Sequence, residues 1–294
     1  MNARDDLPYP GPPGDGPLRL AFVGRSTVFA PAALERHDGA VRTLFVDHRR
    51  GGDPGDTRAA LDAFAPHAVV VFRPGAVAPG TFAGLRAPVL GVVTQPADVP
   101  AHDDADRLVA LTPCRLPGAW RSMPTPVADR FFRPVRRVRG VPRMLFLGPP
   151  TAHRERYLLD VKHRFDCLHA VFGLDADELE RVLDAHHIAF NLDGEPGVED
   201  RVPLHLAAGQ LLITEPLAPG YGLESGLDHL EVSYPEELLH AATTARTYPD
   251  AYHRMRVRGR QKAERLRASR VWPALVRDLL LDLRAFGTHR SAAA

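Results

Sequence analysis

The sequence predicts an α/β protein made of two doubly wound, Rossmann-like domains. Short apolar runs recur along the 294-residue chain and alternate with segments of helical periodicity. Several runs are apolar almost without interruption, as in VVVF at residues 69–72, which is typical of parallel strands covered on both faces. The alternation pauses after residue 111 and begins again at residue 144. We therefore expect two sheets, each covered by helices.

The composition is that of an ordinary globular protein. Hydrophobic residues make up 45% of the chain and charged residues 25%, and the net charge of +1 gives no global field that would attract nucleic acid or a membrane. No apolar run reaches the about 20 residues of a membrane-spanning helix, and residues 1–17 do not read as a signal peptide. We expect a cytoplasmic protein that binds no nucleic acid. The 14 histidines form no convincing metal set, and Cys114 and Cys167 are expected to be free thiols.

The first domain is expected over residues 18–135, after a disordered, Pro- and Gly-rich tail at residues 1–17. Its expected strands are the apolar runs Leu18–Val23, Val41–Asp47, Pro66–Phe72, Pro88–Val93 and Leu108–Leu111. Short helices are expected at residues 32–37, 57–64 and 82–86.

A linker at residues 136–142 is expected to lead into a second domain at residues 143–269. The expected strands are Met144–Gly148, His187–Asn191, Leu211–Thr214 and Leu230–Val232, and the expected helices are 152–165, 178–186, 202–209, 235–247 and 252–269. Four arginines in and beside the linker indicate either a solvated connector or an electropositive rim that attracts an anion: Arg136, Arg137, Arg139 and Arg143. Residues 270–294 are expected to form a C-terminal helix whose apolar stripe packs back on the first domain.

Residues 187–215 form the most informative stretch. A strand that ends at Asn191 is followed by a polar loop, a helix that begins near Arg201 and ends at Gly209, and a strand that ends at Thr214. Parallel sheets bind ligands at the carboxyl ends of their strands and at helix N-termini, where N–H groups favour anions. A guanidinium at such a helix start suits a diphosphate.

Arg154 is a second candidate for binding phosphate. It lies in the first turn of the helix at residues 152–165, which Thr151 can cap. A basic residue in a first turn is unfavourable for the helix dipole unless an anion lies nearby. The alternative is a surface arginine paired with Glu155 or Asp160.

This stretch resembles the C-terminal half of group-1 glycosyltransferases with the GT-B fold, especially the CgeB-like, spore-maturation-protein branch. The matching positions are Asn191, Arg201-Val202, Ala207-Ala208-Gly209 and Leu212-Ile213-Thr214-Glu215, with a looser match at Pro126, Asp129, Phe132 and Pro134. The family's acid after Arg-Val-Phe, which resembles the ribose-binding acid of related enzymes, falls on Leu204, and His205 follows. A second family acid, after the fourth strand, is replaced by Thr94-Gln95.

The resemblance implies two domains that face each other across a cleft, with a nucleotide-sugar donor mainly on the second and an unidentified acceptor on the first. It implies a metal-independent glycosyltransferase without a cofactor, in which positive side chains and helix N-termini stabilise the leaving diphosphate. The implied donor-binding residues are Arg154, Asn191, Arg201, Gly209, Thr214 and Glu215. The sequence does not fix the acceptor-activating base, for which the candidates at strand ends are Asp47, His48 and Asp98.

The two missing acids leave two alternatives open. One is a catalytically degenerate GT-B protein that serves as a binding or scaffolding subunit. The other is a GT-B enzyme that epimerises or hydrolyses a nucleotide sugar. The sequence specifies neither the sugar nor the oligomeric state.

Overall fold

The computed structural model of the chain describes residues 16–48, 53–100, 104–171, 174–194 and 201–287. The chain divides into two compact units. Unit 1 comprises residues up to Met123 together with residues from Ala268 onward, and unit 2 comprises Pro124–Arg267. Most of the tail expected at residues 1–17 lies outside the described residues, as does the second half of the polar loop before Arg201.

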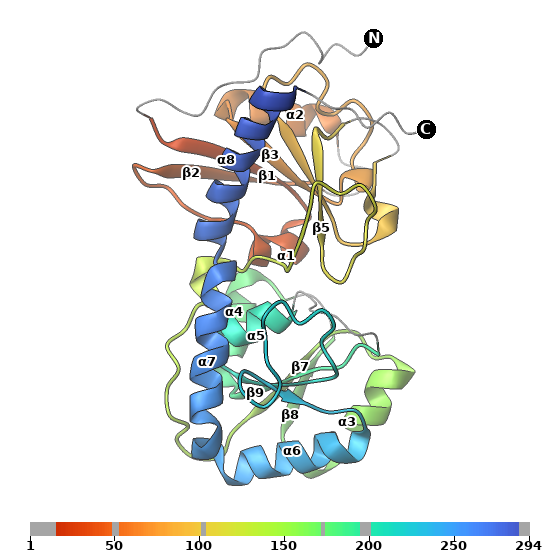
Figure 1. Cartoon of the computed structure of the whole chain (residues 1–294), viewed down its shortest axis with the longest axis vertical. Coiled ribbons are helices and arrows are strands. Elements are labelled where there is room, and N and C mark those ends of the chain that lie inside the picture. The colour runs from red at the N-terminus through yellow and green to blue at the C-terminus, as the bar shows by residue number, and fades with distance from the viewer. Residues whose placement is uncertain (1–15, 49–52, 101–103, 172–173, 195–200, 288–294) are drawn as a thin grey trace. The chain divides into compact units, whose positions relative to one another are not determined.

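Unit 1 is built on a parallel sheet of six strands in the order β2-β1-β3-β4-β5-β6 (Figure 1). The strands are β1 (Leu18–Gly24), β2 (Val41–Asp47), β3 (Ala68–Phe72), β4 (Val89–Val93), β5 (Arg107–Leu111) and β6 (Arg121–Met123). Every residue of β3 and β4 is buried, which explains their lack of polar alternation. The sequence does not predict β6, because this three-residue edge strand is largely exposed and carries no apolar run.

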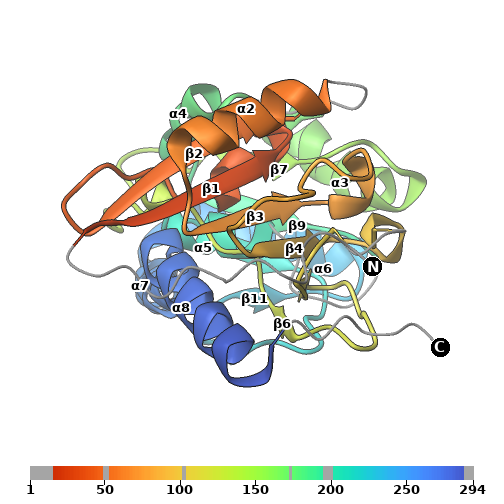
Figure 2. The same ribbon diagram turned by 90° about the horizontal axis from the view of Figure 1, so that it is seen from above.

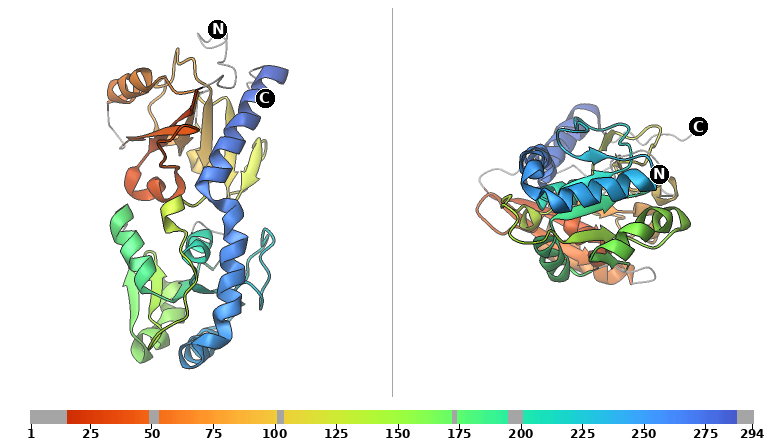
Figure 3. Two further views of the ribbon diagram at one scale, coloured as in Figure 1. Left: turned by 90° about the vertical axis from the view of Figure 1, so that its left-hand side faces the viewer. Right: turned by 90° about the horizontal axis from the view of Figure 1, so that it is seen from below.

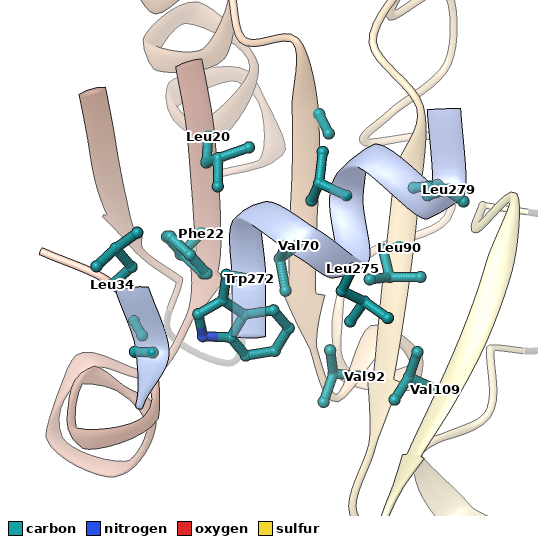
Figure 4. Close-up of a cluster of buried hydrophobic side chains, with 14 of the residues drawn as sticks. Leu20, Phe22, Leu34, Val70, Leu90, Val92, Val109, Trp272, Leu275 and Leu279 are labelled. Atoms are coloured by element: carbon teal, nitrogen blue, oxygen red, sulfur yellow. The ribbon is translucent and has the colours of Figure 1, made fainter. Parts of the chain in front are cut away.

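Two helices cover opposite faces of this sheet (Figure 2). Helix α2 (Pro54–Phe64) begins at Asp53, whose side chain accepts the Gly55 N–H at 2.8 Å, and buries Leu61 against β1 and β3. Helix α8 (Ala268–Phe286) covers the other face with the expected apolar stripe (Figure 4). The C-terminal helix is therefore part of the first unit's core, although the whole of unit 2 separates it in sequence from the strands that it covers.

Trp272 is the central residue of that core. It is fully buried, its Nε1–H donates to the Ala32 carbonyl oxygen at 2.7 Å, and its ring meets Phe22 and Phe72 edge-on at centroid distances of 5.6 and 5.9 Å. Edge-to-face aromatic pairs and a satisfied indole N–H are the arrangements in which a buried tryptophan stabilises most.

The prediction of short helices at residues 32–37 and 82–86 is wrong. Helix α1 (Ser26–Phe29) and a 3-10 turn at Ala30–Ala32 come earlier than the first of them. The chain then turns at Asp38, whose carboxylate accepts the N–H groups of Ala40 and Val41 at 2.8 and 2.9 Å. A side chain that accepts hydrogen bonds from nearby backbone N–H groups stabilises a turn and so competes with helix formation. Residues 82–86 form turns around Gly84, whose φ is +68°.

Unit 2 is built on a second parallel sheet, of five strands in the order β11-β10-β9-β7-β8. The strands are β7 (Met144–Leu147), β8 (Cys167–Ala170), β9 (Ile188–Asn191), β10 (Leu211–Thr214) and β11 (Leu230–Glu231). Helices α3 (Ala152–Arg164) and α6 (Pro235–Thr247) bury side chains on one face, and α4 (Ala176–Ala185), α5 (Arg201–Ala207) and α7 (His253–Ala263) on the other. The sequence does not predict β8, a half-exposed edge strand that contains only one large aliphatic residue.

Residues 124–135, which we expected at the end of the first domain, belong to unit 2. Phe131 is buried in the core between the second sheet and α4, α5 and α7. The Arg133 N–H donates to the Ala207 carbonyl oxygen at 3.0 Å, and the Val127 N–H to the Leu266 carbonyl oxygen at 2.8 Å. The apolar residues of this segment therefore find their core in unit 2.

Gly259 sets how closely α7 packs on its neighbours (Figure 3, left, where α7 lies alongside α5). A Cβ at this position would lie 2.7 Å from the Asp228 carbonyl oxygen and 2.8 Å from Leu206 Cδ2. Alanine gains about 1 kcal/mol of helix propensity over glycine, but the overpacking costs more. We expect Gly259→Ala to lower the free energy of unfolding by roughly 1–3 kcal/mol, as measured by urea unfolding followed by circular dichroism. Gln261→Ala, at an exposed position of the same helix, should change it by less than about 0.5 kcal/mol; an equal effect of both would contradict this account.

Candidate functional site

The site in unit 2 lies at the carboxyl ends of β7, β9 and β10. From β7 the chain passes to β8 on one side, whereas β9 lies on the other, so β7 and β9 flank the point where the strand order reverses. Open parallel sheets bind ligands at this point. The segments that leave these three strands carry Gly148, Asp193 and Glu215.

Arg154 reaches this edge from the first turn of α3. Thr151 caps the helix, and its hydroxyl accepts the Arg154 N–H at 3.2 Å. The guanidinium donates to the Leu192 carbonyl oxygen at 2.8 Å, to the Pro149 carbonyl oxygen at 3.0 Å and to Asp193 Oδ1. Neither acid proposed as its surface partner holds Arg154; it is held inward, with its side chain 11% exposed.

Arg201 approaches the same carboxylate from the start of α5. Its Nη1 lies 3.6 Å from Asp193 Oδ1. The guanidinium packs on Gly148, where an added Cβ would lie 2.9 Å from Nη1 and where φ is +141°. Glycine is required here, because a Cβ would overlap the Arg201 guanidinium and because residues with a side chain rarely adopt this φ. Two cations 47 residues apart in sequence thus converge on one carboxylate whose side chain is 4% exposed.

Asn191, Thr214 and Glu215 line the adjoining part of this edge. Asn191 Nδ2 donates to Thr214 Oγ1 at 3.1 Å, and both residues are buried. The Glu215 carboxylate holds His153 Nε2 at 2.9 and 3.0 Å and accepts the Gly194 N–H at 2.9 Å. Five of the six proposed donor-binding residues therefore lie at one edge of the sheet.

Gly209 is the exception, because it lies just before β10 at the opposite edge. Its φ of +71° ends the turn after α5, and an added Cβ would lie 2.9 Å from Val135 Cγ2. Arg256, which is buried, donates to the Gly209 carbonyl oxygen at 2.8 Å. Gly209 thus allows a close backbone approach, far from the arginines of the site.

The arginines of the expected linker lie away from the site as well. Arg143 immediately precedes β7, and its carbonyl oxygen accepts the His187 N–H before β9. The Arg136 carbonyl oxygen accepts from Arg256 at 3.1 Å. The side chains of Arg136, Arg137, Arg139 and Arg143 are exposed. Their placement at the amino edge of unit 2 favours the solvated connector.

Position 204 contributes no polar group to the site. Leu204 is 8% exposed and packs in the core beside α4 and α7. His205 is fully buried, and its Nδ1 lies 2.7 Å from Gln210 Oε1. Burial lowers the pKa of His205 to about 4. Neither residue replaces the acid that the family carries here.

A second candidate site lies in unit 1, at the carboxyl ends of its strands. A cavity of about 950 Å³ is bordered by residues that follow β1, β2, β3 and β4, and the three candidates for the base all line it: Asp47, His48 and Asp98. The cavity lies where the strand order of this sheet reverses, between β1 and β3.

Asp98 is held by many donors. Its side chain is 2% exposed and accepts from Arg73 Nε at 2.6 Å, Thr94 Oγ1 at 2.6 Å and the N–H groups of Thr94 and Gln95 at 3.0 and 3.1 Å. Burial alone would raise the pKa of this carboxyl, but the hydrogen bonds from Thr94 and Arg73 outweigh it and lower the pKa. Thr94-Gln95, where the family carries an acid, therefore serves here to anchor Asp98.

His48 is the candidate best suited to accept a proton. Its Nδ1 lies 3.2 Å from Thr57 Oγ1, and burial lowers the pKa of the ring, against the opposing effect of the neighbouring Asp47 carboxylate. The imidazole is therefore neutral near pH 7. Asp47 itself accepts the Ser26 N–H at 2.7 Å.

Sequence reasoning missed Asp193 and His153. Asp193 lies in a polar loop, and nothing in the neighbouring sequence distinguishes it from the other acids of that loop. The available signal was its position, two residues past the end of β9, where a carboxylate can meet the arginines of neighbouring segments. His153 is adjacent to Arg154 in the first turn of α3, and no motif in the sequence singles it out.

The chain is similar in structure to a known glycosyltransferase and to a protein solved with UDP and glucose. A glycosyltransferase from Rickettsia africae superposes with a TM-score of 0.53 at 11% sequence identity, covering 90% of this chain and 99% of that one. HepE from Anabaena, in complex with UDP and glucose, superposes with a TM-score of 0.52 at 10% identity, covering 89% of this chain and 99% of HepE. The sequence matches no protein-family model and no curated protein.

At these identities the similarity establishes the fold. The chain is an α/β protein with two parallel sheets and has the fold of the GT-B glycosyltransferases. Both cysteines are free thiols, as expected. Among the described residues, no helix combines the length and the apolar character needed to cross a membrane.

Proposed function

We propose that this protein is a metal-independent glycosyltransferase of the CgeB-like branch, which transfers a sugar from a nucleotide-sugar donor bound by unit 2. Three lines of support agree. The fold is that of GT-B glycosyltransferases, HepE has been solved with UDP, and five of the six implied donor-binding residues lie at one edge of the second sheet.

One observation carries this proposal. Arg154 and Arg201, from different helices, place their guanidiniums on one buried carboxylate at the ligand-binding edge of a parallel sheet. Such a pair suits a diphosphate, because guanidinium groups bind phosphate oxygens with directed, charge-assisted hydrogen bonds. Positive groups held in place before the reaction stabilise the charge that develops on the leaving diphosphate.

The acceptor is proposed to bind in the unit 1 cavity, with His48 as the base that takes the proton of its hydroxyl. A neutral imidazole at the cavity wall can accept a proton at neutral pH. Asp98 is less suited to this role, because its oxygens are already committed to Arg73, Thr94 and Gln95.

A binding or scaffolding subunit is the second candidate function. Leu204 favours it, because a buried apolar side chain occupies the position of the family's ribose-binding acid. A protein of this kind binds a nucleotide sugar without turning it over. Transfer of a radiolabelled sugar to an acceptor, or its absence despite tight binding, distinguishes the two.

Removing either guanidinium tests the donor site. We expect Arg154→Ala and Arg201→Ala each to weaken the binding of the tightest ligand among UDP, GDP, dTDP and their sugar conjugates. A charge-assisted contact contributes about 1.5–3 kcal/mol, or roughly 10- to 100-fold in affinity. Affinity can be measured by thermal shift, since a ligand that binds only the folded state raises its stability.

Arg164→Ala is the matched control, since Arg164 is exposed in the last turn of the same helix as Arg154. It should leave affinity unchanged. Unchanged affinity in folded Arg201→Ala would show that the diphosphate does not meet this guanidinium.

A further inference from the structure

Two side-chain oxygens at the carboxyl edge of β9 are buried without a hydrogen-bond partner among the described residues: Asn191 Oδ1 and Asp193 Oδ2. Asn191 is 3% exposed, and the Asp193 side chain is 4% exposed. A buried acceptor without a donor is costly, and native structures hold few of them. Such atoms near a ligand site point to a ligand that donates.

The orientation of the Asn191 amide follows from its neighbours. The Thr214 hydroxyl donates to the Glu215 carbonyl oxygen at 2.9 Å, so it can only accept from Asn191. Asn191 Nδ2 therefore faces Thr214, at 3.1 Å, and Oδ1 is the atom left over. The orphaned group is thus an acceptor.

The Asp193 carboxylate is fixed in the same way. Arg154 and Arg201 both engage Oδ1, which leaves Oδ2 as the remaining acceptor. The edge therefore combines two guanidiniums, which suit an anion, with two acceptors, which suit hydroxyl groups. A phosphate alone would satisfy the first pair and leave the second unpaired.

We propose that Asn191 Oδ1 and Asp193 Oδ2 accept hydrogen bonds from the hydroxyl groups of a sugar ring that is joined to the bound diphosphate. This inference rests on the proposed function, and it names the residues that recognise the hydroxyl groups of the proposed ligand. The ring is the ribose of the nucleotide or the sugar to be transferred. Leu204 offers the ring no polar group, so Asn191 at the end of β9 and Asp193 just after it are left to recognise the hydroxyls.

Asp193 then has opposite effects on two classes of ligand. Its negative charge lies beside both guanidiniums and opposes a ligand that is only an anion. Its free oxygen favours a ligand that also carries hydroxyl groups. Asp193→Asn removes the negative charge. It also replaces a carboxylate, in which both oxygens accept hydrogen bonds, with an amide that has only one accepting oxygen.

The experiment measures dissociation constants by calorimetry for inorganic pyrophosphate, for UDP, GDP and ADP, and for UDP-glucose, GDP-mannose and ADP-glucose. For each variant, the preference for a nucleotide is the dissociation constant of pyrophosphate divided by that of the nucleotide. These ratios are then compared between variants. We expect Asp193→Asn to bind pyrophosphate at least as tightly as the wild type does. Its preference for a nucleotide over pyrophosphate should fall about tenfold. Asn191→Ala, which changes no charge, should lose preference similarly and leave pyrophosphate binding unchanged.

Asp160→Asn is the control, because it makes the same chemical change at an exposed position of α3. It should leave every affinity unchanged. A loss of preference already seen with the nucleoside diphosphates assigns the acceptors to the ribose. A loss seen only with the sugar conjugates assigns them to the transferred sugar.

Two other results have distinct meanings. Equal changes for pyrophosphate and nucleotides in both site variants would overturn this inference and leave the proposed diphosphate site standing. No binding of pyrophosphate or of any nucleotide by the wild type would overturn the proposed function, and this inference with it.

Discussion

Trp272→Ala should destabilise unit 1 by about 3–5 kcal/mol, the range measured when a large aromatic side chain is removed from a core. The substitution empties a fully buried site, removes two edge-to-face contacts with Phe22 and Phe72, and leaves the Ala32 carbonyl oxygen without its donor. An effect of this size is a large fraction of the stability of an ordinary domain.

Fluorescence can follow this effect in unit 1 alone. The chain has two tryptophans, and the other, Trp120, is partly buried against the same core, so it reports the unfolding of unit 1 in the variant. Urea unfolding should show an early transition by Trp120 emission.

Two further variants calibrate the result. Trp272→Phe keeps an aromatic ring and loses the hydrogen bond, so it should cost less than Trp272→Ala. Leu281→Ala, at a 57% exposed position of α8, should change the transition by less than about 0.5 kcal/mol. A small effect of Trp272→Ala would mean that α8 is not required for the unit 1 core.

His205 should make unit 2 lose stability below neutral pH. Its Nδ1 carries the proton, because Gln210 uses its Nε2 to donate to the carbonyl oxygens of Leu183 and His186 and presents Oε1 to the ring. Nε2 of His205 is buried without a partner among the described residues, so a second proton would be placed where no group accepts it. This burial lowers the pKa of the folded state to about 4.

The direction of the pH effect follows from proton binding. An unfolded histidine has a pKa near 6.5, so between about pH 6.5 and pH 4 the unfolded chain binds more protons than the folded one. The contribution to stability is complete above pH 6.5 and is lost as the pH falls toward 4. Between pH 7.5 and 4.5 the loss from this residue is roughly 2–3 kcal/mol.

His205→Asn separates this effect from that of the other histidines. The asparagine Nδ2 can replace the Nδ1–H donor toward Gln210, and it does not titrate in this range. Urea unfolding followed by circular dichroism at pH 7.5 and 4.5 should show a smaller drop in the variant than in the wild type. Equal drops would show that His205 is not buried in its neutral form.

The positions of most strands along the chain were predictable because the burial of these strands is nearly complete. β3 and β4 are apolar throughout, and such runs stand out from their surroundings. β6 and β8 were missed because they are edge strands, whose exposed residues need not be apolar. The domain boundary was placed too late because residues 124–135 carry no sequence signal of which core Phe131 will enter.

The candidate site was predictable only where strand ends define it. Asn191, Thr214 and Glu215 follow from the ends of β9 and β10. The contacts between Asp193, Arg154 and Arg201 depend on how three loops meet, which spacing along the chain does not encode. Gly209 matched the pattern of the family, but its position before β10 places it at the other edge.

The split composition of unit 1 also bears on how the chain is made. Its six strands emerge from the ribosome before unit 2, but α8 emerges after it. Until then the face formed by Leu20, Phe22, Val70 and Leu90 has no helix to cover it. Unit 2 is continuous and can fold as it is synthesised. We therefore expect the nascent first sheet to expose an apolar face until α8 is made, and we expect this face to be the part of the chain that most needs a chaperone during synthesis.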